Sequence, residues 1–142
     1  MAVEKRLKIH TDGGSRGNPG PAAIGIVLEG PDGEIIKEFK RHIGKATNNQ
    51  AEYEALIEGL KLARLYWNGP VECFSDSELL IKQVNGEYDV KNKALKVAHA
   101  AVEKFAKQFP SIKFTHVRRE DKVQAIADKL VNEALDEEMG KK

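Results

Sequence analysis

Four carboxylates, far apart in the chain, each stand next to the end of a predicted strand or helix. They are Asp12, Glu52, Asp76 and Asp128. Asp12 follows a strand-like run over residues 7–11 and opens a glycine-rich loop. Because folding can bring such junctions together, we interpret the four acids as ligands of one metal site.

Oxygen ligands of this kind suit Mg²⁺, which proteins usually hold with one or two carboxylates while it keeps several waters. Two such ions, about 4 Å apart, can hold the attacking water and the leaving oxygen of a phosphate displacement. Without a cation the acids would repel one another, so the pKa of at least one of them should be raised. The alternative for each acid alone is a surface residue, a helix cap or an ion-pair partner.

Alternating and helical hydrophobic patterns predict the elements that would position these acids. Strands are expected at 7–11, 22–28, 34–43, 71–75 and 112–117, and helices at 48–67, 77–84, 94–109 and 128–138. Three strands followed by helical crossovers predict an α/β fold with a five-stranded mixed sheet and helices on both faces. The first strand should lie in the centre, parallel to the fourth.

In such sheets, binding sites form beyond the carboxyl ends of the parallel strands. Asp12 and Asp76 both stand at such ends. Glu52 and Asp128 fall on the inward stripes of their helices, near the predicted helix starts, where an acid is unusual for core packing. Thr47 or the residue after it can cap the helix that carries Glu52.

The bulk properties indicate an ordinary globular protein. The 142 residues fit a single domain over 1–142, and the hydrophobic fraction of 41% excludes a disordered chain. The single cysteine, Cys73, excludes an internal disulfide and a cysteine-based zinc cluster. No run resembles a signal peptide or approaches the roughly 20 apolar residues of a membrane span, so we expect a cytoplasmic protein with no membrane partner.

Charge is distributed unevenly although the net charge is only +1. Residues 91–119 carry eight Lys or Arg and one acid, whereas residues 46–90 carry three bases and eight acids. A basic segment beside an acidic pocket suits a metal-dependent nuclease, because phosphates attract cations. The alternative is a solvated, lysine-rich helix face.

Four segments together resemble the motifs of type 1 ribonuclease H, in the same order and with the same kinds of element between them. They read Asp-Gly-Gly-Ser-Arg-Gly-Asn-Pro-Gly at 12–20, Thr-Asn-Asn-Gln-Ala-Glu at 47–52, Ser-Asp-Ser at 75–77 and Ala-Asp-Lys-Leu at 127–130. The first two motifs are highly specific together, and the third alone is weak. The resemblance spans essentially the whole chain and implies a ribonuclease H-like fold.

The resemblance implies cleavage of the RNA strand of RNA–DNA hybrids, leaving 5′-phosphate and 3′-hydroxyl ends. Two Mg²⁺ ions, or Mn²⁺ in their place, would be the cofactors. By this analogy Asp12 bridges both ions, Asp128 holds the ion that activates water, and Glu52 and Asp76 hold the ion on the leaving-group side.

The same resemblance implies a set of substrate-binding residues: Gly13, Ser15, Asn18, Lys45, Thr47, Asn48, Asn49 and Gln50. The polar residues of this set would read the minor groove of the hybrid and its 2′-hydroxyls, which distinguish RNA from DNA. Thr47, with Lys45, would contact a phosphate of the DNA strand. For Asn48 the alternative is simple helix capping.

The chain also departs from the family pattern. It lacks the inserted basic loop of some relatives, and no appended hybrid-binding domain is expected, so it resembles the compact branch of the family. We also expect a monomer. The segment 118–127 looks about two residues longer than usual, and Gln124 stands where Asn is common. Arg119 is our candidate for a phosphate contact, and His116 could assist catalysis or be a structural strand residue.

Two other hypotheses remain open from the sequence. A non-catalytic hybrid-binding module would result if the lengthened segment displaced Asp128. A different nuclease of the same fold, such as a resolvase or transposase-like domain, would usually lack the pair of asparagines at 48 and 49. The fold alone does not separate these functions.

Overall fold

The computed structural model describes residues 5–140 and contains five strands and four helices within that range. The strands are β1 (Leu7–Ser15), β2 (Gly20–Glu29), β3 (Ile35–Ala46), β4 (Val71–Ser75) and β5 (Ile112–His116). The helices are α1 (Asn48–Arg64), α2 (Glu78–Val84), α3 (Lys93–Ala106) and α4 (Lys122–Met139). The predicted order of elements is confirmed.

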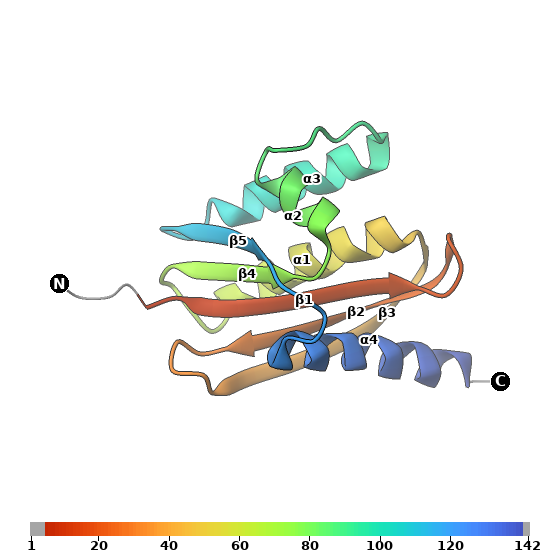
Figure 1. Ribbon diagram of the computed structural model, residues 1–142, viewed down its shortest axis with the longest axis horizontal. Helices are drawn as coiled ribbons and strands as arrows, with labels where there is room; N and C mark the ends of the chain where they lie inside the picture. The colour runs from red at the N-terminus through yellow and green to blue at the C-terminus, as the bar shows by residue number, and fades with distance from the viewer. Residues whose placement is uncertain (1–4, 141–142) are drawn as a thin grey trace.

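All five strands form one mixed sheet in the order β3-β2-β1-β4-β5 (Figure 1). β1 is antiparallel to β2 and parallel to β4, and β4 is parallel to β5. The first strand is therefore central, as predicted. Helix α1 connects β3 to β4 and crosses over the sheet, so β4 lies beside β1 and runs parallel to it. The carboxyl ends of β1 and β4 consequently lie at the same edge of the sheet.

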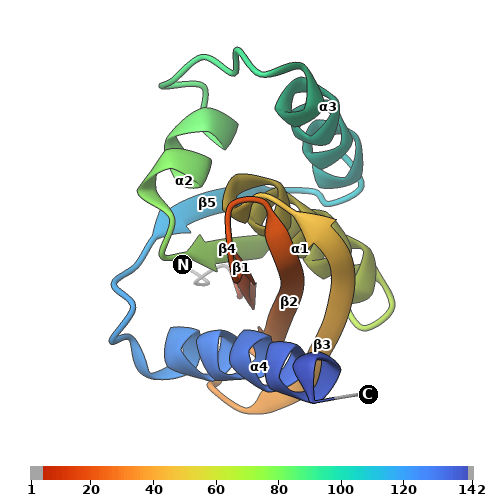
Figure 2. The same cartoon turned by 90° about the vertical axis from the view of Figure 1, so that its right-hand side faces the viewer.

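Helices cover both faces of the sheet (Figure 2). On one face α1 packs against β1 and β2, and α3 packs on α1. This layer contains the main core, which includes Leu7 and Ile9 of β1 and Leu56 and Leu60 of α1. On the other face α4 packs over β2 through smaller buried clusters.

Two glycines allow these helices to approach the central strands closely. At Gly13 a Cβ would overlap the carbonyl group of Ala51 in α1, and at Gly25 it would overlap the carbonyl oxygen of Ala127 in α4. Gly13 follows Asp12 in β1, and Gly25 is paired with Asp12 across the β1–β2 ladder. The backbones of both helices therefore meet the sheet beside the same residue.

The last helix differs from its predicted start at Asp128. α4 begins at Lys122 because Asp121 caps it, with the Asp121 carboxylate accepting hydrogen bonds from the backbone amides of Val123 and Gln124 at 3.1 and 3.0 Å. Asp128 therefore lies in the second turn of α4. The prediction that Asp128 stands near a helix start was wrong, although its position on the inward side was expected.

The other element boundaries moved by a few residues. β1 runs on to Ser15, so Asp12 lies within the strand and not after its end as predicted. β3 runs on to Ala46, while α1 ends at Arg64 and α3 at Ala106. Among residues 5–140, no helix has the length and apolar character needed to cross a bilayer. The expectations of a cytoplasmic location, a monomer and a single domain over 1–142 stay predictions.

Replacing Gly25 should test the docking of α4. We expect Gly25→Ala to lower the free energy of unfolding by about 2 kcal/mol or more, because the added methyl group overlaps backbone that cannot rotate away. Chemical denaturation measures the change. Gly14→Ala is the matched control, since its Cβ would lie 3.5 Å from Val131 Cγ1, an ordinary contact. Equal stability of the two variants would contradict the close packing at Gly25.

Candidate active site

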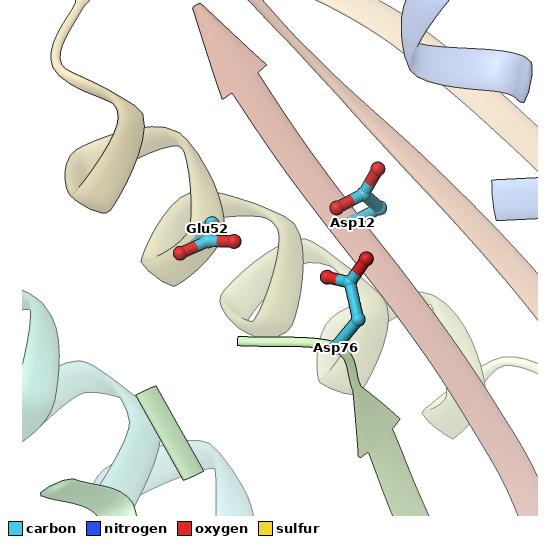
Figure 3. A group of neighbouring side chains, drawn as sticks. All are labelled: Asp12, Glu52 and Asp76. Carbon is cyan, nitrogen blue, oxygen red and sulfur yellow. The ribbon is translucent and has the colours of Figure 1, made fainter. Parts of the chain in front are cut away.

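Three of the four predicted carboxylates meet just beyond the carboxyl end of β4, beside the part of β1 that continues past it. One carboxylate oxygen from each of Asp12, Glu52 and Asp76 lies within 4.8 Å of the others. Asp12 projects from β1 and Glu52 from the first turns of α1, and Asp76 is the residue that follows β4 (Figure 3). The sequence prediction that these acids converge is confirmed.

Local structure holds Glu52 against Asp12. Thr47 caps α1, and the Thr47 hydroxyl accepts a hydrogen bond from the Gln50 amide at 3.1 Å while the Gln50 side chain accepts one from the Thr47 amide at 2.8 Å. This reciprocal capping box fixes where the helix begins. Since Ala51 then packs on Gly13, Glu52 is directed to the end of β1.

Asp76 is held by the turn that joins β4 to α2. The Ser75 hydroxyl accepts a hydrogen bond from the Ser77 amide at 3.1 Å, and the Ser77 hydroxyl caps α2 by accepting one from the Leu80 amide at 3.1 Å. Ser77 also donates a hydrogen bond to the carboxylate of Glu52. The turn thus connects the Asp76 position to α1.

Asp128 reaches the same site from the opposite layer. It lines a shallow pocket of about 150 Å³ together with the other three acids, and its side chain is hydrogen-bonded to that of Asp12. Asp128 is not one of the three acids whose oxygens all lie mutually close. The arrangement therefore places Asp12 in the middle, with Asp128 on one side and with Glu52 and Asp76 on the other.

The electrostatics of the site are unfavourable without a cation. Burial, and then the negative charges of Asp76, Asp128 and Glu52, raise the pKa of Asp12 to about 9. Burial likewise raises the pKa of Glu52 to about 7, with the charge of Asp76 adding to the effect and the Ser77 hydrogen bond opposing it. The expected rise in at least one carboxyl pKa is thus present at Asp12.

Arg119 contributes a positive charge to the site. Its Nε lies 3.4 Å from Asp76 Oδ2, and the hydrogen bond and charge of Asp76 raise the pKa of the Arg119 guanidinium. The Arg119 side chain is 76% exposed, so the solvent screens this pair. Its place at the rim of the pocket agrees with the predicted phosphate contact, which stays a prediction.

His116 lies outside the pocket. It is an exposed residue of β5 and pairs with Ser75 of β4. Among the described residues, those that line the carboxylate pocket do not include His116. Its proposed part in catalysis has no contact to support it, and the role of a strand residue accounts for its position.

The predicted substrate-binding residues surround the loop between β1 and β2 and the start of α1. Asn48 Oδ1 accepts a hydrogen bond from the Ser15 amide at 3.3 Å, and Asn18 Oδ1 accepts one from the Asn48 amide at 3.1 Å. Both asparagines therefore tie the loop to the helix. Asn49 is exposed beside Glu52 in the first turn of α1.

The remaining residues of the predicted substrate-binding set lie in the cap of α1, near the end of β3 and beneath α1. Thr47 and Gln50 form the capping box, and Lys45 is an exposed residue near the end of β3. Gly13 is buried beneath α1, so helix packing gives a physical reason for this glycine besides any approach of a nucleic-acid backbone.

The sequence interpretation missed two polar residues that line the pocket. Arg16 follows β1 and pairs with Asp136 of α4 at 2.7 Å. Asn132 lies one helical turn after Asp128 and donates a hydrogen bond to the Asp128 carbonyl at 3.1 Å. The spacing of four residues on one helix could have indicated Asn132.

The donor set fits a hard divalent cation. All four side chains offer only carboxylate oxygens, and neither cysteine nor histidine lines the pocket among the described residues. Oxygen ligands of this kind favour Mg²⁺, Mn²⁺ or Ca²⁺ over metals that prefer nitrogen or sulfur. A bound cation would also offset the repulsion that raises the pKa of Asp12.

Comparison with known proteins gives the family. Residues 10–134 match the family model described as "Reverse transcriptase-like". The chain is 42% identical over 132 residues to Ribonuclease HI of Halobacterium salinarum, covering 93% of this chain and 65% of that relative. It also covers only 36% of a bifunctional protein of Mycobacterium tuberculosis, at 39% identity over 92% of this chain.

Solved structures agree with the sequence comparison. The crystal structure of RNase H1 from Halobacterium salinarum superposes with a TM-score of 0.89 at 42% identity, over 93% of this chain and 98% of that one. LC11-RNase H1, solved in complex with an RNA/DNA hybrid, gives a TM-score of 0.89 at 41% identity, over 95% and 100% of the two chains. The fold, the carboxylate cluster and these similarities together show that the chain belongs to the type 1 ribonuclease H family.

Proposed function

We propose that this protein hydrolyses the RNA strand of RNA–DNA hybrids in a reaction that requires divalent metal ions. The observation that carries the proposal is the convergence of Asp12, Glu52 and Asp76, with Asp128 hydrogen-bonded to Asp12. The similarity to an RNase H1 that was solved with an RNA/DNA hybrid supports the choice of substrate.

The arrangement of the acids supports two metal positions that share Asp12. Asp12 and Asp128 would hold one ion, and Asp12, Glu52 and Asp76 would hold the other, with Mg²⁺ as the ion and Mn²⁺ as a substitute. When bound, the ions supply an activated water and stabilise the charge that develops on the leaving oxygen. The water oxygen would bond to phosphorus as the bond to the 3′-oxygen breaks, leaving a 5′-phosphate and a 3′-hydroxyl.

The chain's own residues would orient the hybrid around this site. Arg119 is placed to contact a phosphate at the pocket rim, with Asp76 holding its guanidinium nearby. The asparagines at the start of α1 stand at the edge of the site, where amide groups can bond to 2′-hydroxyls and base edges of the minor groove. Thr47 and Lys45 remain the candidates for a DNA-strand phosphate.

A non-catalytic hybrid-binding module is the alternative that the segment 118–127 suggested. Residues 122–127 of this segment belong to the first turns of α4, and Asp128 still contacts Asp12. The geometry thus favours a complete site. A hybrid that is bound tightly but never cut in Mg²⁺ or Mn²⁺ would reverse this choice.

Neutralising Asp12 should abolish cleavage. We expect Asp12→Asn to lower the rate of hydrolysis of a labelled RNA–DNA hybrid by at least about 1,000-fold, since both metal positions lose a ligand. EDTA should have the same effect on the unmodified protein. Asp32→Asn is the matched control, because Asp32 is a surface aspartate 3.9 Å from Lys5 and should leave the rate unchanged. Undiminished cleavage by Asp12→Asn would reject the proposal.

The same substitution should stabilise the metal-free protein in a pH-dependent way. The pKa of Asp12 is 3.8 in its ordinary state and about 9 in the fold, so the stability of the folded state decreases as the pH rises from about 4 to 9. Asparagine carries no such charge. We therefore expect Asp12→Asn to raise the free energy of unfolding by about 2 kcal/mol at pH 8, and by less at pH 5.

Denaturant titrations in EDTA at the two pH values measure this difference. Adding Mg²⁺ should stabilise the unmodified protein and reduce the gap, because the cation offsets the repulsion at Asp12. If the two proteins differed in free energy of unfolding by the same amount at pH 5 and pH 8, the raised pKa of Asp12 would not be the cause of the difference.

Asn49 and Asn48 should differ when each is replaced by alanine. Asn49 is exposed beside the site, so Asn49→Ala should raise KM for the hybrid about 5-fold, the loss of roughly one hydrogen bond, without changing stability. Asn48→Ala should raise KM and also lower the melting temperature, since the Ser15 amide loses its partner. Steady-state kinetics and thermal unfolding distinguish the two. Unchanged KM in both variants would remove the asparagines from the substrate interface.

A further inference from the structure

A buried glutamine connects the two elements that carry Asp12 and Asp128. Gln124 lies in the first turn of α4 and is 0% exposed. Its Nε2 donates a hydrogen bond to the carbonyl oxygen of Thr11 at 2.8 Å. Its Oε1 lies 3.3 Å from Nδ1 of His10. A fully buried amide is costly unless both of its ends are bonded, and here both are.

The hydrogen-bond chain continues through His10 to β2. His10 Nε2 lies 3.1 Å from Glu29 Oε1, and the His10 ring stacks on Phe74 of β4 with ring centroids 4.7 Å apart. The Gln124 amide nitrogen is used by Thr11, so its oxygen faces His10 and can only accept. Glu29, at the end of β2, closes the chain, and the network therefore joins α4, β1, β2 and β4.

This hydrogen-bond network lies next to two of the four carboxylates. Thr11 immediately precedes Asp12, and Gln124 precedes Asp128 by four residues, which is one helical turn. Gln124 thus holds α4 to the backbone beside one metal ligand, one turn away from the other. In the same region α4 also makes apolar contacts, through Ala127 and Leu130 on Val27.

Apolar contacts and hydrogen bonds constrain a helix differently. Apolar packing is non-directional, so it keeps α4 on the sheet but tolerates small rotations and shifts along the helix axis. Hydrogen bonds weaken steeply when their distance or angle changes, so Gln124 resists such movements. A shift of this kind would alter the distance between the Asp12 and Asp128 carboxylates directly.

We propose that Gln124, held by His10 and the Thr11 carbonyl, is a positioning residue that sets the spacing of Asp12 and Asp128 and so the affinity of the site for a divalent ion. The proposal rests on the metal-dependent function proposed above. Residues that orient metal ligands typically change metal affinity by about 10- to 100-fold when they are removed.

The test is the Mg²⁺ concentration that gives half of the maximal thermal stabilisation, measured on the folded protein without substrate. We expect Gln124→Leu to raise this concentration about 10-fold. Cleavage of the hybrid should show the same shift in its Mg²⁺ dependence, with kcat recovering at high Mg²⁺ and KM for the hybrid unchanged. An unshifted Mg²⁺ curve for Gln124→Leu would overturn the proposal.

Leu130→Ala is the matched control. Leu130 is a buried residue of the same helix that packs on Val27 and does not line the carboxylate pocket, so its loss weakens α4 docking without removing a directional contact. We expect lower stability and a Mg²⁺ curve that moves less than 2-fold. A shift equal to that of Gln124→Leu would show that general packing of α4, not Gln124, sets the spacing.

A double variant keeps the test valid if Gln124→Leu folds poorly. His10→Phe combined with Gln124→Leu replaces both partners of the Gln124–His10 pair by apolar groups, which commonly restores part of the stability even though the Thr11 carbonyl and Glu29 each lose a partner. We expect stability to recover while the weakened Mg²⁺ response remains. Recovery of both together would mean that the single variant acts only through stability.

The two proposals fail in different ways. If the unmodified protein cuts the hybrid with Mg²⁺ and Gln124→Leu has the same Mg²⁺ dependence, the positioning role is wrong and the function stands. If the unmodified protein binds Mg²⁺ but does not cut, the function is wrong, and thermal stabilisation still decides the role of Gln124. If neither Mg²⁺ nor Mn²⁺ stabilises the unmodified protein, the positioning role is wrong as well.

Discussion

Mutual repulsion of the carboxylates around Asp12 is the constraint on which the rest of the structure depends. Asp12 is 8% exposed and faces three other acids, and burial together with these charges raises its pKa to about 9. Such a cluster would separate if its side chains were on mobile loops, so each acid must be held by an element that the core fixes. The central strand β1 supplies the fixed point. Gly13 and Gly25 then let α1 and α4 approach it from opposite faces beside Asp12.

The two helices that complete the site are held by different kinds of contact. α1 is part of the main core and is further fixed by its capping box, so packing along the whole helix determines the position of Glu52. α4 rests on smaller buried clusters, and its C-terminal half pairs with β3 and with the loop after β1 through exposed Lys40–Glu137 and Arg16–Asp136 contacts. Exposed ion pairs contribute little. The buried hydrogen bonds of Gln124 therefore contribute more than these ion pairs to holding the N-terminal part of α4, where Asp128 lies.

Much of this arrangement could be predicted from the sequence because its signals are local. Alternation and helical periodicity located the strands and helices, and Thr47 as a possible N-cap marked the start of α1. The start of α4 was missed because Asp121 caps it, and a capping acid is hard to recognise within a charged run. A glycine inside a strand, such as Gly25, can indicate a close approach or a bulge, but the helix that approaches it, and the burial of Gln124, depend on which helix covers which strand. Those contacts are tertiary, so no pattern within a single segment reports them.

The distribution of charge also indicates where a cation would matter most. Asp76 already has Arg119 at 3.4 Å, whereas Asp12 is surrounded by three other acids and is the most buried of the four. At neutral pH Asp12 retains a proton, because its pKa of about 9 lies above the pH. A metal ligand must lose that proton, so an ion that binds there displaces it, and binding becomes tighter as the pH rises toward 9. Under the proposed function, the same burial that strains the metal-free site thus makes Asp12 the residue at which protonation and metal binding exclude each other.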